Sequence, residues 1–220
     1  MKKRREFYIV LAVSVAFSLM MVMPPRIFAQ TEKGIQLYNA WEYQEAEKVL
    51  RSALKTNPQD ITADFYLGLS VLLQGKYDEA LNLFQKVKVE RENAAQTSAS
   101  LPDAYQIQIG LARANLGLEK YAEAWKNLET AEKLNAALPD VYVYRGVYYL
   151  RKDDNGKAIK ELEKAIKMDP DNVYAHYYAG HAYLRSGNPA RAVDMFKNFI
   201  ELAPDAPEVP KAKALIDALC

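Results

Sequence analysis

Two consecutive blocks of equal length decide the fold. They are PDVYVYRGVYYLRKDDNGKAIKELEKAIKMDPDN, residues 139–172, and VYAHYYAGHAYLRSGNPARAVDMFKNFIELAPDA, residues 173–206. Each block has a glycine at its eighth position and an alanine at its twentieth. Self-similarity at a fixed period of 34 residues is typical of a chain built from stacked structural repeats.

The same phase extends back toward the N-terminus with one break. Gly34 and Gly68 are 34 residues apart, whereas Gly68 and Ala112 are 44 apart, which indicates a ten-residue insertion between them. Five units then start at positions 27, 61, 105, 139 and 173. Small residues at unit positions eight and twenty define them: Gly34 and Ala46, Gly68 and Ala80, Ala112 and Ala124, Gly146 and Ala158, Gly180 and Ala192.

Each unit contains two amphipathic segments separated by turn-forming residues. Apolar residues recur at spacings of three and four, which predicts two α-helices per unit. Gly75 and residues 153–156 and 186–189 mark turns between them, and Asn188 is predicted to cap a helix that starts at Pro189. The small residues allow two helices to approach closely, and a larger residue at position 24 fills the adjacent space. One hairpin cannot bury its apolar face alone, so we expect the hairpins to stack.

Residues 27–206 resemble the tetratricopeptide repeat (TPR) family. The family pattern has a small residue at position eight, alanine at twenty, a leucine or aromatic residue at twenty-four and proline at thirty-two. Units one, four and five have that proline, at Pro58, Pro170 and Pro204. The resemblance implies an all-α fold, a right-handed superhelical solenoid with a concave inner face, and a protein-binding rather than enzymatic role.

We divide the chain accordingly. Units one and two cover residues 30–94 and units three to five cover residues 105–206, with an insertion at 95–104 that either forms a loop or extends the preceding helix. Residues 207–220 carry an amphipathic pattern, which predicts a helix that caps the open end of the array. Residues 1–29 are assigned to export.

The N-terminal segment has the order of a secretory signal. Four basic residues at positions 2–5 precede an apolar run at 7–23, and the junction between Ala29 and Gln30 suits cleavage. Because the run is near the lower limit for crossing a bilayer, an uncleaved membrane anchor is the alternative. Both interpretations place the repeats outside the cytoplasm, and the bacterial periplasm is the expected compartment.

No pattern in the chain points to catalysis, a cofactor or a metal. His176 and His181 are five residues apart and do not share a helix face, and the lone cysteine, Cys220, cannot form an intramolecular disulfide. The net charge of +1 is balanced, which argues against a nucleic-acid partner. We therefore expect a protein or peptide partner, with the membrane involved only through the N-terminal segment.

The resemblance also implies which residues line the concave face. Positions two, five and nine of each first helix do so in the family. The partner-binding residues carried over in this way are Phe65, Leu69, Ile109, Arg113, Val143, Val147, Tyr174, Tyr177 and His181. Unit one adds Thr31 and Ile35, and unit two adds Thr62.

The expected groove is apolar and rich in tyrosine. Family members that grip a carboxylate tail use Lys, Asn and Arg at four positions that hold Thr31, Ile35, Gln106 and Gly110 here, so that clamp is absent. Apolar anchors with few polar groups suit an extended peptide or a partner helix. The alternative is that several of these side chains pack against adjacent helices instead.

Overall fold

The computed structural model describes residues 25–93 and 101–219. Within these ranges the chain forms eleven helices and no strand, as the repeat pattern predicts. They are α2 (Pro25–Asn39), α3 (Tyr43–Thr56), α4 (Ile61–Leu73), α5 (Tyr77–Asn93), α6 (Ala104–Gly117), α7 (Tyr121–Leu134), α8 (Pro139–Arg151), α9 (Asn155–Met168), α10 (Val173–Arg185), α11 (Pro189–Leu202) and α12 (Val209–Leu219).

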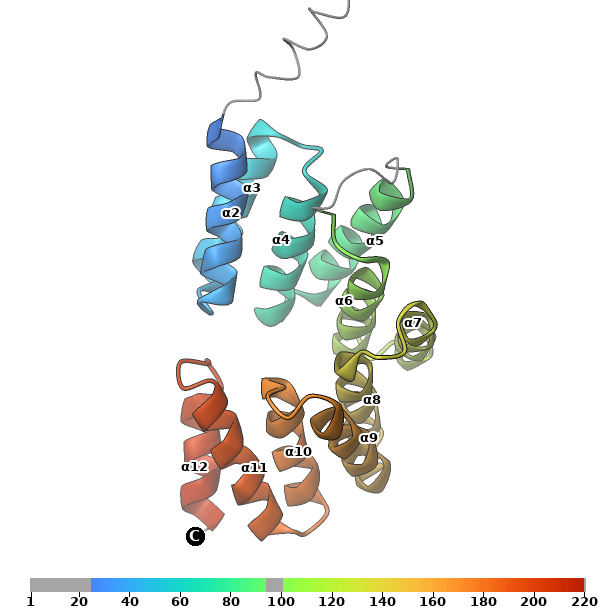
Figure 1. The fold of residues 1–220 in the computed structure, drawn as a ribbon, viewed down its shortest axis with the longest axis vertical. Coiled ribbons are helices and arrows are strands. Elements are labelled where there is room, and N and C mark those ends of the chain that lie inside the picture. Colours follow the sequence, from blue (N-terminus) through green and yellow to red (C-terminus); the bar gives the residue numbers. More distant parts are fainter. Residues whose placement is uncertain (1–24, 94–100, 220) are drawn as a thin grey trace, which may run out of the picture.

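The helices stack as five antiparallel hairpins followed by α12, which packs on α11 (Figure 1). The first helices of hairpins two to five are α4, α6, α8 and α10. They supply most of the residues that line a cavity inside the array. The first 24 residues of the predicted export segment, residues 94–100 around the start of the predicted insertion, and Cys220 lie outside the described residues. Helix α5 continues to Asn93, just before the predicted insertion at 95–104.

Close contact between the two helices of a hairpin depends on the small residue at position eight. A Cβ atom built on Gly146 would lie 2.5 Å from Cγ of Leu162, and one built on Gly180 would lie 2.6 Å from Cε1 of Phe196. Both distances are shorter than real Cβ contacts allow. The prediction that position eight must be small because position twenty-four occupies the adjacent space is confirmed at these two hairpins.

Phe84 extends this contact to the following unit. Its ring lies 2.9 Å from a Cβ built on Gly68 of its own hairpin and 2.7 Å from one built on Gly110 of the next. The side chain is fully buried. Phe84 therefore joins units two and three, which the predicted insertion separates in the sequence.

All five hairpin turns place unit position fifteen in the left-handed region. Glycine occupies this position in two turns, where Gly75 and Gly187 have φ angles of 78° and 81°. Trp41, Glu119 and Asp153 adopt φ angles of 65°, 59° and 58° in the other three. Left-handed backbone is unfavourable for residues with a Cβ atom, so packing of the hairpins must enforce it there.

The cap of α11 follows the sequence prediction. The helix begins at Pro189, and the side chain of Asn188 accepts a hydrogen bond from the backbone N–H of Arg191 at 3.2 Å. Proline needs no partner for its nitrogen in the first turn, so the pair starts the helix without an unsatisfied donor at that position.

Candidate partner-binding surface

The two ends of the array approach each other. Trp41, in the turn between α2 and α3, packs edge-on against Tyr174 of α10, with ring centroids 6.2 Å apart. A pocket beside this contact is lined by residues 41–45, Leu73, Gln74 and Pro207. In Figure 1 the turn after α2 and the segment before α12 face each other at the left. The stacked hairpins therefore curve far enough to enclose a hollow.

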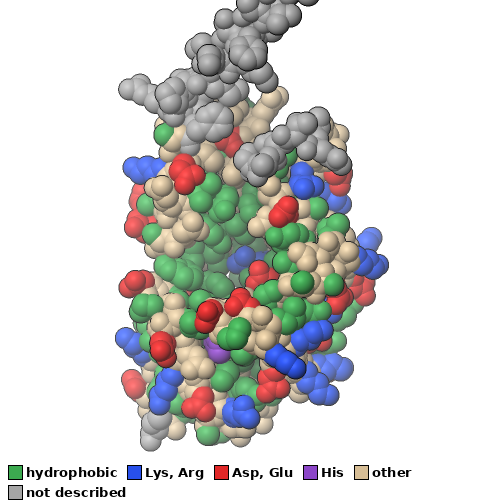
Figure 2. Space-filling view, viewed as in Figure 1, with side chains coloured by type: hydrophobic (Ala, Val, Ile, Leu, Met, Phe, Trp, Pro, Cys, Tyr) green, Lys and Arg blue, Asp and Glu red, His purple; other side chains and the backbone are tan. Residues whose placement is uncertain are grey.

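We call the space inside this curve the central cavity; its volume is about 200 Å³. Figure 2 shows the hollowed face, in which hydrophobic side chains predominate and basic atoms lie deep inside. The lining residues come from four successive hairpins and the segment before α12: Leu72, Leu73, Tyr77, Arg113, Leu116, Gly117, Tyr144, Val147, Arg151, Tyr178 and Glu208.

Arg113 is the most distinctive residue of the central cavity. Its guanidinium carbon lies 5.0 Å from the ring centroid of Tyr144, a cation–π contact. Burial acts to lower the pKa of Arg113, but interactions with Tyr144, Tyr38 and other tyrosines hold it above its ordinary value. The side chain is only partly exposed and stays positively charged at every physiological pH.

Six of the nine predicted groove residues are buried in the packed helices. Phe65, Leu69, Ile109, Val143, Val147 and Tyr177 are all at most 8% exposed. Arg113, Tyr174 and His181 are partly exposed. Of the nine, only Arg113 and Val147 line the central cavity. The other seven contribute to packing within the array, and their role in partner binding stays a prediction.

Several cavity residues were missed by the sequence reasoning. Tyr144 and Tyr178 occupy position six of their units, and Leu73, Gly117 and Arg151 occupy position thirteen. Position six neighbours position five, and position thirteen lies one turn beyond position nine. A wider stripe along each first helix would have included them. Glu208 belongs to no repeat, so no repeat position could have indicated it.

Tyr177 and His181 form one aromatic contact within the fold. Their rings are 4.7 Å apart, and Tyr177 also packs against Phe199 at 5.0 Å. Burial lowers the pKa of His181 to about 4, with smaller contributions from Lys211 and Arg185, so the ring is neutral at physiological pH. Burial raises the pKa of Tyr177 to about 12. A charged residue in place of Tyr177 would disturb the core, so its effect on partner binding could not be separated from its effect on folding.

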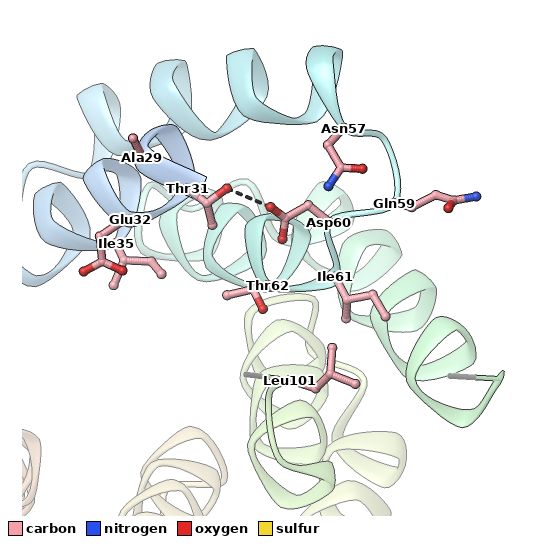
Figure 3. A pocket seen from close by; sticks show the side chains of 10 residues that line it. All are labelled: Ala29, Thr31, Glu32, Ile35, Asn57, Gln59, Asp60, Ile61, Thr62 and Leu101. Atoms are coloured by element: carbon pink, nitrogen blue, oxygen red, sulfur yellow. Dashed lines mark hydrogen bonds between the residues drawn. The ribbon is translucent and has the colours of Figure 1, made fainter. Parts of the chain in front are cut away.

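A third pocket, of about 610 Å³, lies at the N-terminal end of the array (Figure 3). Thr31, Ile35 and Thr62, which the resemblance assigns to the concave face, all line it, together with Leu101 beyond the insertion. Thr31 donates a hydrogen bond from its hydroxyl to the Asp60 carboxylate at 2.8 Å. That carboxylate also caps α4 through the Ala63 N–H at 2.9 Å, so its acceptors are engaged by the fold.

The predicted cleavage junction lies in the first helix. Ala29 and Gln30 are both within α2, and Ala29 is exposed. Thr31, which ties α2 to the start of α4, is on the C-terminal side of this junction. Removing residues 1–29 would therefore leave that connection in place.

The described residues show neither a metal-binding cluster nor a membrane span. Across residues 25–93 and 101–219, no three His, Cys, Asp or Glu side chains gather so as to hold a metal ion. In the same ranges no helix combines the length and apolar character needed to cross a bilayer. His176 is buried, and its Nε2 lies 2.8 Å from the carbonyl oxygen of Pro170.

Hairpins stacked in one phase around a hollow define a helical-repeat solenoid protein. The family model described as "Tetratricopeptide repeat" matches residues 31–96 and 143–207, more than half of the chain. The chain belongs to the tetratricopeptide repeat family, whose members act as scaffolds that bind peptides or proteins.

Solved structures show the same fold at low sequence identity. A thermophilic TPR protein of Thermus thermophilus, TTC0263, is 20% identical with a TM-score of 0.71, and the match covers 88% of this chain and 98% of that one. MamA of Desulfovibrio magneticus RS-1 is 19% identical with a TM-score of 0.53, covering 84% of this chain and 99% of that one. No curated protein matches the sequence. These likenesses establish the architecture alone.

Proposed function

We propose that this chain is an exported scaffold that binds other proteins through the hollow enclosed by its inner helices. The observation that carries the proposal is the central cavity, to which four hairpins and the segment before α12 contribute. Tyr77, Tyr144 and Tyr178 line it, and tyrosine offers rigid contact area with a polar tip. Membership of the TPR family supports a binding role.

Site-specific photo-crosslinking tests this proposal without assuming the chemistry of the partner. Arg151 and Lys152 are adjacent, exposed residues at the end of α8, but only Arg151 lines the central cavity. Each is replaced in turn by the photo-reactive residue benzoylphenylalanine in the producing cells. We expect one partner to be crosslinked from position 151 and not from position 152, as identified by mass spectrometry.

The matched pair makes the outcome decisive. The Lys152 ammonium instead lies 4.7 Å from the ring centroid of Tyr121, and Lys152 does not line the cavity. Equal crosslinking from both positions, or none from position 151, would show that the central cavity is not the binding surface.

The export proposal makes a separate prediction about the N-terminus. Basic residues followed by an apolar run support a secretory signal, and we expect the mature protein to begin at Gln30. The alternative proposal is a membrane-anchored assembly factor for an envelope, secretion or cofactor-attachment machine. N-terminal sequencing of protein from the envelope fraction separates the two, since an intact segment 1–29 in the membrane pellet supports the anchor.

A further inference from the structure

Arg113 is a partly buried cation that the fold leaves without an acidic partner. Elsewhere the fold pairs such charges: Arg145 bonds to Glu132, and buried Asp64 accepts from Lys86 at 2.6 Å. Among the described residues Arg113 makes no ion pair and no hydrogen bond, and its close contact is the ring of Tyr144. Its N–H donors therefore face the central cavity unused.

An unpaired guanidinium in this environment favours a bound anion. Partial burial removes some of the hydration of a cation, and a cation–π contact offsets that cost only in part. The guanidinium has five N–H donors, in a planar fork that matches a carboxylate. A carboxylate entering the cavity would accept hydrogen bonds from donors to which the described residues offer no acceptor.

The remaining charges of the central cavity agree with this interpretation. Arg151, which is exposed, adds a second positive charge, and Glu208 is the one acidic residue among the described residues that line the cavity. The Glu208 carboxylate forms no ion pair with either arginine, and its Oε2 is buried without a hydrogen-bond partner among the described residues. Two arginines and one glutamate give the described lining residues an excess of one positive charge.

The size of the central cavity limits what can enter. One turn of an α-helix, about 10 Å across and 5.4 Å long, fills on the order of 400 Å³. The central cavity is smaller, about 200 Å³, so we infer that a single side chain with part of an extended backbone enters it rather than a whole helical turn. An extended segment can present one acidic side chain to Arg113.

We propose that Arg113 binds the carboxylate of an Asp or Glu side chain carried by an extended segment of the protein partner. This inference rests on the proposed function, because it names the chemistry of the segment that enters the central cavity. It differs from the family's carboxylate clamp, whose positions hold Thr31, Ile35, Gln106 and Gly110 in this chain.

Short randomised peptides, acetylated and amidated at their ends, provide the probe. Each pool fixes one central residue as Glu, Asp, Gln or Lys, and binding to the full-length protein is measured by biolayer interferometry. We expect the Glu or Asp pool to bind about ten-fold or more tightly than the Gln pool, as expected for hydrogen bonds to a charged group. Arg113→Met should abolish this preference, and Glu208→Gln should increase affinity for the acidic pools.

Matched controls keep the test specific. Arg191 also stacks on a tyrosine, with its guanidinium 5.6 Å from the Tyr183 ring centroid, but it does not line the cavity. Arg191→Met should therefore retain the full preference for acidic peptides. Arg113→Lys keeps the positive charge but removes the planar guanidinium, so part of the preference for acidic peptides should remain. This variant also covers the case in which Arg113→Met fails to fold.

Each result either supports the proposal or overturns it. Peptide binding with no preference for acidic residues would overturn the role of Arg113 while leaving the proposed function intact. Binding by no pool would contradict both. A preference for peptides with a free C-terminal carboxylate, or for helical peptides, would assign the cavity to a chain end or a helix instead. A preference that survives Arg113→Met would place the site elsewhere.

Discussion

Replacing Phe84 with alanine is expected to lower the free energy of unfolding by about 3–5 kcal/mol. The ring is fully buried between Gly68 and Gly110 and also contacts Phe65, with centroids 5.8 Å apart. Glycines have no side chains that can move into the vacated space, so the cavity persists. Urea unfolding followed by circular dichroism measures the loss.

The position of Phe84 adds a second expectation. Because α5 and α6 join units one and two to the remaining three, weakening their contact should reduce coupling along the array and broaden the transition. Val89 on the same helix is 55% exposed, and Val89→Ala should change stability by less than about 0.5 kcal/mol. A loss below about 1 kcal/mol for Phe84→Ala would contradict the assigned packing.

Replacing Lys86 with methionine is expected to lower the free energy of unfolding by about 2–3 kcal/mol at neutral pH. This is less than the loss for a fully buried ion pair, because solvent partly screens the lysine. Asp64 is 2% exposed, and its carboxylate accepts a 2.6 Å hydrogen bond from the Lys86 ammonium. Removing one partner of a buried ion pair leaves the other charge buried and unpaired, which destabilises the fold by about 3–5 kcal/mol. The Lys86 side chain is 43% exposed, which weakens the pair through solvent screening and lowers the expected cost.

The destabilisation by Lys86→Met should depend on pH. Burial raises the pKa of Asp64 even with Lys86 present, and losing that ammonium should raise it further. A carboxyl with a raised folded-state pKa binds its proton more tightly in the folded chain. Its stabilising contribution is complete below its unfolded value of about 3.9 and is lost as pH rises through the folded value. The variant should therefore approach the parent in stability toward acidic pH.

The pH profile separates electrostatics from packing. Urea unfolding is measured for both proteins at several values between weakly acidic and neutral pH. Asp64→Asn combined with Lys86→Met removes both charges and should recover much of the loss at neutral pH. A deficit that is equal at all pH values would show that the lysine stem, not its charge, carries the effect.

Helix placement was largely predictable because it depends on neighbours along the chain. Helices α4, α8 and α10 begin at the first residue of units two, four and five, and α11 begins at Pro189 as predicted. Unit three begins one residue early at Ala104, and α2 begins at Pro25, before the predicted start of unit one. The N-terminal segment precedes α2, and the insertion precedes α6. Neither segment has a counterpart in the other units, so the repeat pattern does not fix where these two helices begin.

Turn geometry and the inner surface were less predictable. Glycine signals a left-handed residue at Gly75 and Gly187, and Asp153 lies in a turn that its polar residues mark. Trp41 and Glu119 adopt the same conformation with no sequence signal. The family positions selected nine groove residues, of which two line the central cavity. Residues at positions two, five and nine of a short first helix face both the hollow and the adjoining helices, so spacing alone does not separate lining from packing.

The sequence by itself determined the period, the phase and the small residues at each helix contact, because these depend on a hairpin and its immediate neighbours. Only the tertiary structure decided that Trp41 meets Tyr174 and that Glu208 joins Arg113 around one cavity. Each of these pairs joins parts of the array that are far apart in the sequence. Their meeting depends on small rotations accumulated over five stacked hairpins, and no local pattern encodes that sum.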